Sequence, residues 1–448
     1  MSAAPRPASQ AVPFREALRF WVKLGFINFG GPTGQIAIMH HELVEKRHWI
    51  GEQQFLHALN FAMLLPGPEA HQLAIYVGWL LNGGPGAIAA GLFFLLPAFF
   101  LMVVLSCLYA AHGDVSWVSA IFDGLAWGVV GIVAAALVRI AGRALKTGLM
   151  LAVAAAAFLA LYVFAVPFPF VLLGAGAIGL VGGTRLTRAR PVPEQREPDA
   201  AAAAGPERVR PTWPRAARVL GVGLAVWLGP LALIGLAAGP GSVLADEALF
   251  FGFMALVTFG GAYAVLAYVN QAAVMRFGWL TAGEMAVGLS LSETTPGPLI
   301  LVVVFVGFVA AYRSPGGLDP VTAGIAGSLV TAWATFVPSF LWIFLGAPSV
   351  ERLRGNVRLS AALSTITAGV VGVVLSLAVL FAVNVLFDEV RTARFLGHDV
   401  TVPDLGTVDP IALAAAAAGF IALWRFRVSV VWVVLAAGAA GWIRWLVG

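Results

Sequence analysis

The sequence has little charge and few of the residues that build catalytic or redox centres. Asp, Glu, Lys and Arg make up 11% of its 448 residues, whereas hydrophobic residues make up 60%. A soluble protein of this length needs far more polar side chains to cover its surface, so a soluble globular fold is excluded. The apolar residues form successive runs of roughly 17 to 25 residues, the length of a membrane-spanning helix. These runs predict an all-α polytopic membrane protein surrounded by the lipid bilayer.

The sequence also lacks motifs for metals, nucleotides and haem, and their absence excludes several classes of function. The single cysteine, Cys107, lies in an apolar run, which excludes a disulfide framework and a cysteine-based metal site. The chain has no Gly-x-x-x-x-Gly-Lys-Ser/Thr loop for ATP, no dinucleotide-binding motif and no helical histidine pair for haem. We therefore expect neither an enzyme nor a bound cofactor. The net charge of +5 comes from basic residues between the apolar runs, which membrane topology explains without a nucleic-acid partner.

The apolar runs predict about thirteen membrane spans. They cover residues 14–38, 55–82, 85–110, 119–142, 147–163, 167–183, 217–238, 246–270, 283–312, 318–345, 358–387, 410–424 and 428–446. The runs 147–163, 167–183 and 410–424 are short for a core of about 30 Å, so we expect them to tilt, to thin the bilayer or not to cross it fully.

Two halves of the chain, residues 14–183 and 246–446, repeat each other. Phe29-Gly30-Gly31 recurs as Phe259-Gly260-Gly261, and Pro66-Gly67-Pro68 recurs as Pro296-Gly297-Pro298, each 230 residues later. Further along, Pro97 matches Pro338 and Gly128-Val129-Val130-Gly131 matches Gly369-Val370-Val371-Gly372, each 241 residues later. Constant spacings of this kind indicate a duplication with one insertion.

The segment between the halves sets their expected orientation. Residues 184–215 are rich in proline, alanine and charge and should form a flexible cytoplasmic linker. Residues 217–238 form an extra connecting helix, so the second half starts after an odd number of spans and an inverted-topology repeat is expected. With the N-terminus in the cytoplasm, most of the 27 Lys and Arg residues lie inside. This places the C-terminus in the periplasm, across a bacterial inner membrane.

Gly-Gly and Pro-Gly-Pro segments interrupt four of the predicted spans. Proline removes a backbone donor and glycine adds conformational freedom, so neither segment fits an ordinary helix interior. Within the bilayer the freed backbone groups need partners in protein or in a water-lined cavity. Such breaks at matching places in two halves indicate a transporter's substrate site. A helix that restarts after a break presents free N–H groups and its positive dipole end, which suits an anion.

The predicted substrate-binding residues are those of the four breaks and the neutral polar residues beside them. They are Gly30, Gly31, Pro32, Thr33, Gln35, Pro66, Gly67, Pro68, Gln72, Thr258, Gly260, Gly261, Thr294, Thr295, Pro296, Gly297 and Pro298. Neutral donors can hold a tetrahedral dianion without a fixed cation that would hinder its release. The alternative is structural, with glycines that allow close helix packing and prolines that kink helices.

A few charged residues are further candidates. Glu69 and Glu293 lie beside the Pro-Gly-Pro breaks, and a carboxylate inside the membrane is a functional candidate for proton exchange during transport. Alternatively, they accept hydrogen bonds at a helix restart. Lys23 either faces the substrate path or extends to the membrane surface. The segment from His40 to His48 resembles a metal cluster in composition, but it lacks ligand spacing, so we expect a solvated entrance and no metal.

These motifs resemble the chromate ion transporter family in its long, two-domain form. The matching stretches are Phe29-Gly30-Gly31-Pro32 with Gln35, Leu65-Pro66-Gly67-Pro68-Glu69-Ala70 with Tyr76-Val77-Gly78-Trp79, and Glu293-Thr294-Thr295-Pro296-Gly297-Pro298-Leu299 with Phe305-Val306-Gly307-Phe308. Members typically carry Gln before the last stretch, where this chain has Val304. The resemblance implies a secondary transporter that exports chromate across the inner membrane, with sulfate as a structural analogue and the proton gradient as a proposed energy source.

The expected mechanism is alternating access, in which one half rocks against the other about a midplane anion site. An interior-negative membrane potential favours expulsion of a dianion. Two other functions stay open, namely import of sulfate or another oxyanion, and a receptor or scaffold that transports nothing. The sequence does not separate chromate from sulfate, and it leaves the coupling stoichiometry and the oligomeric state open.

Overall fold

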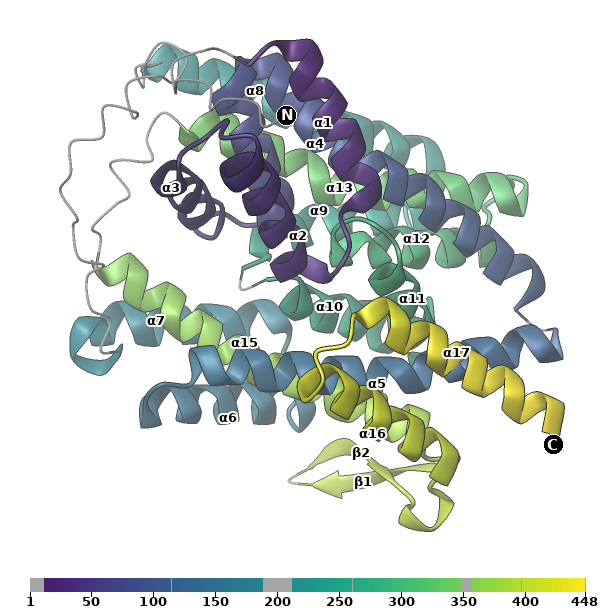
Figure 1. Ribbon diagram of the computed structural model, residues 1–448. Helices are drawn as coiled ribbons and strands as arrows, with labels where there is room; N and C mark the ends of the chain where they lie inside the picture. The colour runs from purple at the N-terminus through teal and green to yellow at the C-terminus, as the bar shows by residue number, and fades with distance from the viewer. Residues whose placement is uncertain are drawn as a thin grey trace, which may run out of the picture. The chain divides into compact units, whose positions relative to one another are not determined.

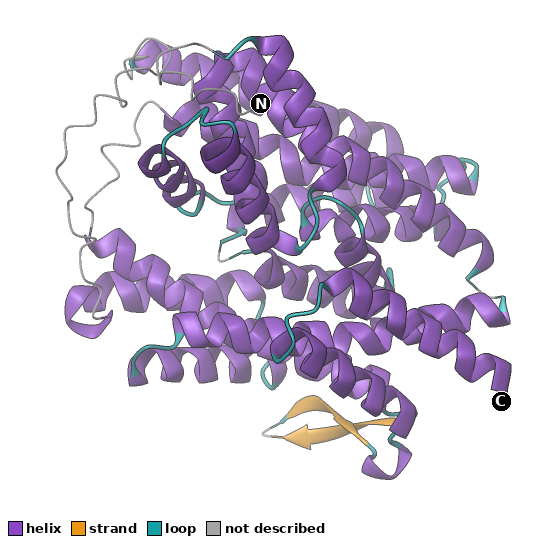
Figure 2. Ribbon diagram, in the orientation of Figure 1, coloured by secondary structure: helices purple, strands orange, loops and turns teal. Residues whose placement is uncertain are grey.

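The computed structural model describes residues 12–113, 115–187, 212–259, 261–347, 357–395 and 397–447. Gly260 and most of the predicted linker, residues 188–211, lie outside the described residues. The described chain is helical almost throughout, with one small β-hairpin (Figure 2). It separates into two compact units, and each unit contains parts of both sequence halves.

The first unit comprises Met1–Val103, Val192–Gly261 and Thr295–Gly355. Its described elements, labelled in Figure 1 where there is room, are α1 (Phe14–Ile27), α2 (Gly31–His40), the π-helix η1 (His41–Lys46), α3 (Glu52–Ala62), most of α4 (Glu69–His112), α8 (Trp213–Ala238), α9 (Val243–Val257), the 3₁₀ turn η4 (Leu299–Leu301), α12 (Val302–Arg313) and α13 (Pro320–Gly346).

The second unit comprises Val104–Pro191, Ala262–Thr294 and Asn356–Gly448. Its described elements are the end of α4, α5 (Ser116–Ala144), α6 (Gly148–Tyr162), α7 (Phe168–Thr187), α10 (Ala262–Asn270), the π-helix η3 (Gln271–Arg276), α11 (Ala282–Thr294), α15 (Val357–Leu386), β1 (Val390–Phe395), β2 (His398–Pro403), the 3₁₀ turn η6 (Leu405–Thr407), α16 (Pro410–Trp424) and α17 (Val430–Val447).

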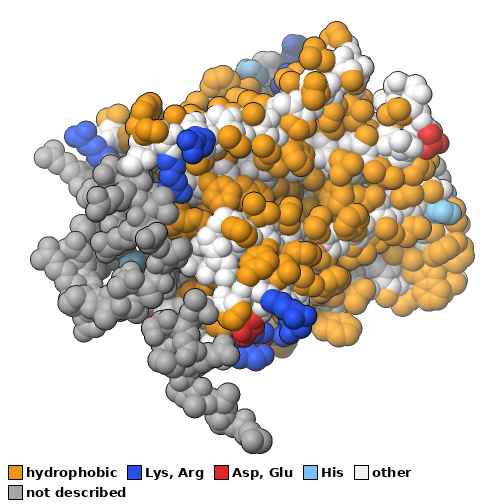
Figure 3. Space-filling view, turned by 90° about the horizontal axis from the view of Figure 1, so that it is seen from above, with side chains coloured by type: hydrophobic (Ala, Val, Ile, Leu, Met, Phe, Trp, Pro, Cys, Tyr) orange, Lys and Arg blue, Asp and Glu red, His pale blue; other side chains and the backbone are white. Residues whose placement is uncertain are grey.

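Helix length and surface composition both match a membrane environment. Six helices among the described residues are long and apolar enough to cross a membrane, namely α4, α5, α8, α13, α17 and the Ser360–Leu386 part of α15. In the view of Figure 3, most side chains at the described surface are hydrophobic, and the charged ones gather in a few groups. The protein is therefore a multi-pass membrane protein.

The predicted spans that carry the breaks are not continuous helices. α1 ends at Ile27 and α2 begins at Gly31, because Gly30 adopts a left-handed backbone conformation with φ of 94°. Figure 1 shows the chain running along α1 and back along α2 after this break. The prediction of one span over residues 14–38 was therefore wrong.

The other three spans with breaks divide in the same way. Residues 55–82 form α3 and the first part of α4, which kinks at Asn82 and Gly83. Residues 246–270 form α9 and α10, and residues 283–312 form α11, η4 and α12. Proline and glycine end each helix locally, as their backbone chemistry requires.

A β-hairpin corrects the all-α prediction. β1 pairs antiparallel with β2, with Val390 opposite Pro403 and Phe395 opposite His398. Gly397, with φ of 84°, turns the chain between the strands. The Tyr162 hydroxyl at the end of α6 donates a hydrogen bond to the Thr401 carbonyl oxygen at 2.6 Å. This polar connection between α15 and α16 gave no apolar run, so the search for membrane spans missed it.

The two halves interlock in the second unit. α5, from the first half, packs against α16 and α17, and α15, from the second half, packs against α6 and α7. Gly131 on α5 lies against the backbone of Ala416 on α16, and Gly372 on α15 lies against the backbone of Ala154 on α6. Gly131 and Gly372 are equivalent in the repeat, so these two contacts correspond. Each half therefore completes the packing of the other.

An alanine at either of these glycines should destabilise the protein. The added Cβ would overlap the carbonyl oxygen of Ala416 or Ala154, and overpacking of a core typically costs about 1–3 kcal/mol. In detergent, Gly131→Ala and Gly372→Ala should therefore unfold at lower temperatures than the wild type. Gly142→Ala on α5 is the control, because no atom lies within 4 Å of its added Cβ. Equal melting temperatures for all three would contradict the interlocked packing.

Candidate functional site

The four breaks come together through two hydrogen bonds in the first unit. The backbone N–H of Gly67 donates to the Thr258 carbonyl oxygen at 2.9 Å, and the N–H of Gly297 donates to the Asn28 carbonyl oxygen at 2.8 Å. Thr258 occupies in the second half the place that Asn28 has in the first, and Gly297 corresponds to Gly67. The two bonds are therefore equivalent, and each joins a Pro-Gly-Pro segment of one half to a Gly-Gly break of the other.

Glycine is required at the centre of both Pro-Gly-Pro segments. Gly67 and Gly297 have φ of 131° and 129°, a region that favours glycine. A Cβ on Gly67 would lie 2.5 Å from Gln72 Nε2 and 3.1 Å from Ser339 Oγ, and a Cβ on Gly297 would lie 2.6 Å from Ala98 Cβ. Ala98 and Ser339 are equivalent in the repeat, because each follows a matched proline. The surroundings of the two glycines therefore correspond as well.

Two buried glutamines hold the Pro-Gly-Pro segments. Gln35 Nε2, on α2, donates a hydrogen bond to the Gly297 carbonyl oxygen, and Gln72 Nε2, on α4, donates to the Pro66 carbonyl oxygen at 2.7 Å. Both side chains are fully buried. The predicted residues Gln35 and Gln72 thus occupy corresponding roles, one on each segment.

Several buried polar atoms around these segments have no hydrogen-bond partner within the described chain. They are both amide atoms of Asn28, the side-chain oxygens of Gln35 and Gln72, and the Thr335 and Ser339 hydroxyls. Buried polar groups are normally paired, because leaving one unpaired costs about 1–3 kcal/mol. All of these groups are neutral; the Asn28 amide nitrogen and the Thr335 and Ser339 hydroxyls can donate a hydrogen bond, whereas the unpaired oxygens of Asn28, Gln35 and Gln72 are acceptors. The site thus offers uncharged donors to a ligand.

Glu69 faces this group from the start of α4. Its Oε2 lies 3.9 Å from the position of a Cβ built on Gly261, in the Gly-Gly break of the other half. Among the residues that the structure describes, none donates a hydrogen bond to the Glu69 carboxylate. The alternative role of Glu69, capping the N–H groups of a restarting helix, is thus not seen.

The remaining break residues in the first unit shape the backbone. Gly31 also has a positive φ, of 64°, and Pro32 stands in the first turn of α2, where no intrahelical donor is needed. The Thr258 hydroxyl donates to the Met254 carbonyl oxygen at 2.6 Å, so it is occupied within its own helix. Thr33, Pro68, Thr295, Pro296 and Pro298 also lie in this unit.

Two predicted residues belong to the second unit. The Glu293 carboxylate, on α11, accepts a hydrogen bond from the Tyr263 hydroxyl at 2.7 Å, and Arg139 on α5 interacts with it electrostatically. The Thr294 hydroxyl donates to the Leu291 carbonyl oxygen at 2.9 Å. Glu293 therefore has partners in its own unit, in contrast to Glu69.

Lys23 is held by an ion cluster that joins α1 to η1. Its Nζ lies 3.4 Å from Glu42 Oε1, and Glu42 also accepts hydrogen bonds from Lys46 and Arg47 at 3.1 and 3.2 Å. The Arg47 guanidinium lies over the Trp49 ring at 4.9 Å. Burial opposes ionisation of Glu42, but the hydrogen bonds from Lys46 and Arg47 outweigh it and lower the pKa of this carboxyl group.

The nearby histidines pair with carboxylates. His40 Nε2 lies 2.6 Å from Glu52, and His41 Nδ1 lies 2.7 Å from Glu45. No group of three or more potential metal ligands occurs within the described part of the chain.

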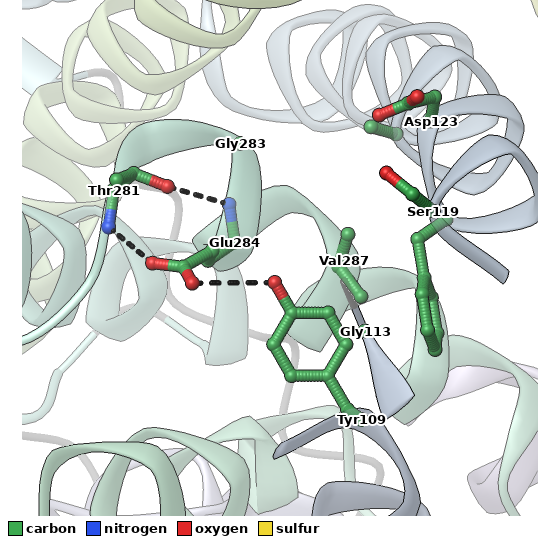
Figure 4. A pocket seen from close by; sticks show the side chains of 10 residues that line it. Tyr109, Gly113, Ser119, Asp123, Thr281, Gly283, Glu284 and Val287 are labelled. Carbon is green, nitrogen blue, oxygen red and sulfur yellow. Dashed lines mark hydrogen bonds between the residues drawn. The ribbon is translucent and has the colours of Figure 1, made fainter. Parts of the chain in front are cut away.

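A pocket in the second unit suits a dianion poorly. It has a volume of about 190 Å³, and Figure 4 shows Tyr109 and Glu284 on one side and Ser119 and Asp123 on the other. Thr281 and Glu284 exchange hydrogen bonds of 2.8 and 3.2 Å as a capping box at the start of α11. The residues that line the pocket thus include two carboxylates, Asp123 and Glu284, and no Lys or Arg. The Glu284 carboxylate caps the start of α11.

Sequence reasoning missed Asn28, Thr335 and Ser339. Asn28 could have been found from the repeat, because it is equivalent to the predicted residue Thr258. Ser339 follows Pro338, but the equivalent position holds alanine, so the sequence carried no polar pattern there.

Comparison with known proteins identifies the family of the chain and again divides it into two segments. The sequence profile of the chromate transporter family matches residues 15–180 and 246–442. The chain belongs to the chromate transporter family. It is 33% identical to a chromate transport protein of Pseudomonas aeruginosa over 445 residues, which cover 98% of this chain and 94% of the relative.

Other members of the chromate transporter family are more distant. A probable chromate transport protein of Synechococcus elongatus is 27% identical over 84% of this chain and 87% of its own length. A chromate transport protein of Cupriavidus metallidurans is 24% identical over 84% of both chains. No solved structure matches the chain. Membership of this family makes the protein a transporter and not an enzyme.

In this chromate transporter family member, the ion cluster around Glu42 should stabilise α1 and η1 above acidic pH. Because the folded-state pKa is lowered, the stabilisation is present above the unfolded value of about 4.5 and is lost as pH falls through the folded value. Wild type and Glu42→Gln should therefore differ in melting temperature at neutral pH and converge in acid. Glu52→Gln, at a mostly exposed side chain, is the control. A difference that persists in acid would contradict this role.

Proposed function

We propose that this protein exports chromate from the cytoplasm by alternating access, with the anion held between the four breaks of the first unit. The observation that carries the proposal is the pair of equivalent bonds from Gly67 to Thr258 and from Gly297 to Asn28. These bonds gather the breaks of both halves around buried polar atoms that lack partners in the described chain. We take chromate as the substrate because the family and the relative in Pseudomonas aeruginosa are described as chromate transporters.

The donor set suits a tetrahedral dianion. The Asn28 amide nitrogen and the Ser339 hydroxyl are neutral donors without a partner in the described chain, and the Gln35 and Gln72 amide nitrogens each keep a second N–H beside the one they donate. A hydrogen bond to a charged group contributes about 1.5–3 kcal/mol, so a few of them bind the anion appreciably. Lys23, the predicted pathway cation, is paired with Glu42 instead. A site without a free cation among the described residues would bind the dianion moderately, which favours release.

The membrane potential can drive transport in the outward direction. An interior-negative potential contributes about 2.3 kcal/mol per charge per 100 mV, so export of a dianion is favoured by twice that amount. The proposed topology has about thirteen spans, short ones included, in an inverted repeat with a cytoplasmic N-terminus. The equivalent bonds at Gly67 and Gly297 support a two-fold relation of this kind, because each half gives the other the same contact.

The moving bodies in this proposal are the two units and not the two halves. Rocking of one half against the other, expected from the sequence, would break the packing of α5 on α16 and α17 and of α15 on α6 and α7. Both compact units contain segments of each half. We therefore assign the alternating motion to the units as bodies.

Proton exchange at Glu69 or Glu293 is an optional coupling step of this proposal. An ionised Glu69 beside the breaks would repel a dianion, so anion binding favours its protonated form, and a proton held there would move together with the anion and not in exchange for it. Glu293 has a hydrogen-bond donor in Tyr263, which stabilises its ionised form until the proton arrives. The two carboxylates thus differ in their partners.

Inside-out vesicles test the direction and the substrate. They should accumulate chromate when the membrane potential is positive inside the vesicle, and sulfate should compete, because it is also a tetrahedral dianion. Vesicles from cells without the protein are the control. Accumulation in right-side-out vesicles alone would indicate an importer, and no flux of either anion in either orientation would overturn the proposal.

Substitutions of unpaired polar residues separate binding from folding. Asn28→Ala and Ser339→Ala remove buried groups that lack partners, so thermal stability should stay equal or rise. Loss of one hydrogen bond to a charged ligand should raise the KM for chromate by about 10- to 100-fold. Ser364→Ala, which removes a hydroxyl bonded to Ser360, is the control. An unchanged KM in both site variants would place the anion elsewhere.

A further inference from the structure

Glu247 on α9 is a buried carboxylate that the proposed anion site does not use. Its side chain is fully buried in the first unit, and neither carboxylate oxygen has a hydrogen-bond partner among the described residues. The equivalent position in the first half, 230 residues earlier, is Ala17, so the repeat does not require a carboxylate there. A buried polar group without a hydrogen-bond partner costs about 1–3 kcal/mol even when it is uncharged. A carboxylate retained at such a cost in a membrane helix is a functional candidate.

Among the described residues, none pairs with Glu247 as a compensating cation. α9 packs against α8, α12 and α13, and α13 carries no charged residue. α12 contributes Tyr312 and Arg313, and α8 contributes Arg215 and Arg218, but none of these four residues donates a hydrogen bond to Glu247. The neighbouring residue on α9 is Asp246. Asp246 is itself acidic and opposes a negative charge on its neighbour. The packed site therefore accommodates Glu247 as the uncharged acid.

Glu247 is connected to the anion site by one buried face of α9. Glu247, Phe251, Met254 and Thr258 follow at intervals of four, three and four residues, so they share one face of the helix, and all four are buried. The carbonyl oxygen of Thr258 accepts the hydrogen bond from Gly67. A shift of α9 that changes this bond would also move Glu247 relative to its packing partners.

We propose that Glu247 binds and releases a proton during the transport cycle and thereby couples chromate export to the pH gradient. In the packed state the carboxylate oxygen carries the proton. When motion of α9 opens its surroundings to water, the O–H bond breaks and the proton passes to water, and the reverse step reloads it. This inference rests on the proposed function and adds a proton site remote from the breaks.

Proteoliposomes with the membrane potential clamped test this role. For inside-out protein, an acidic lumen should accelerate chromate uptake several-fold in the wild type, because protons leave the lumen as chromate enters. Glu247→Gln keeps the size and the uncharged state of the side chain, so it should fold and transport chromate but lose the acceleration. Asp246→Asn is the matched control on the adjacent residue and should keep it. Glu247→Asp, which restores a titratable group, should recover part of it.

Infrared difference spectra give a second readout that does not depend on flux. Addition of chromate should change a carbonyl band of a protonated carboxylic acid in the wild type, and Glu247→Gln should lack that change. A pH response retained in Glu247→Gln, a wild type that transports chromate without a pH response, or an identical spectrum in both proteins would overturn the inference. Absence of any chromate flux in the wild type would instead overturn the proposed function, while the band would still report on Glu247.

Discussion

The structure depends on how two broken helix pairs satisfy the backbone groups that proline and glycine set free. A membrane interior supplies no water to pair with them, so each must find a partner in the protein. Here the N–H groups of Gly67 and Gly297 bond to the carbonyl groups of Thr258 and Asn28 in the opposite half. Each half thus supplies the acceptor for the central N–H of the other half's Pro-Gly-Pro segment. The duplication thus provides the partners of these two backbone groups.

The same reciprocity holds in the second unit. α5 rests on the last two helices of the second half, and α15 rests on those of the first. Glycines at equivalent positions, Gly131 and Gly372, let the helices approach to backbone contact. Close approach of small residues is a main source of helix association in a membrane, where lipid provides no hydrophobic drive. The interlocked halves explain why the compact units do not follow the boundary of the repeat.

The described basic side chains of the first helices lie away from the breaks, whereas the carboxylates of Glu69 and Glu293 lie beside them. Lys23 is neutralised through Glu42, which also binds Lys46 and Arg47, whereas the atoms around Gly67 and Gly297 are neutral amides and hydroxyls. A dianion held by neutral donors keeps its charge available to the membrane potential, and a proton on a buried carboxylate can respond to the pH gradient. The proposed mechanism thus assigns anion binding and proton exchange to different residues.

The sequence by itself determined the membrane class, the repeat and the positions of all four breaks, because hydropathy, proline and glycine act locally along the chain. It also pointed to Gln35, Gln72 and Glu69 through their distance from those breaks. Only the tertiary structure decided that residues 14–38 reverse direction, that Gly67 pairs with Thr258, and that Asn28, Ser339 and Glu247 are buried without partners in the described chain. These properties depend on which helices meet across the two halves. Such contacts join residues about 190 or more positions apart, so no pattern of neighbouring residues in the sequence predicts them.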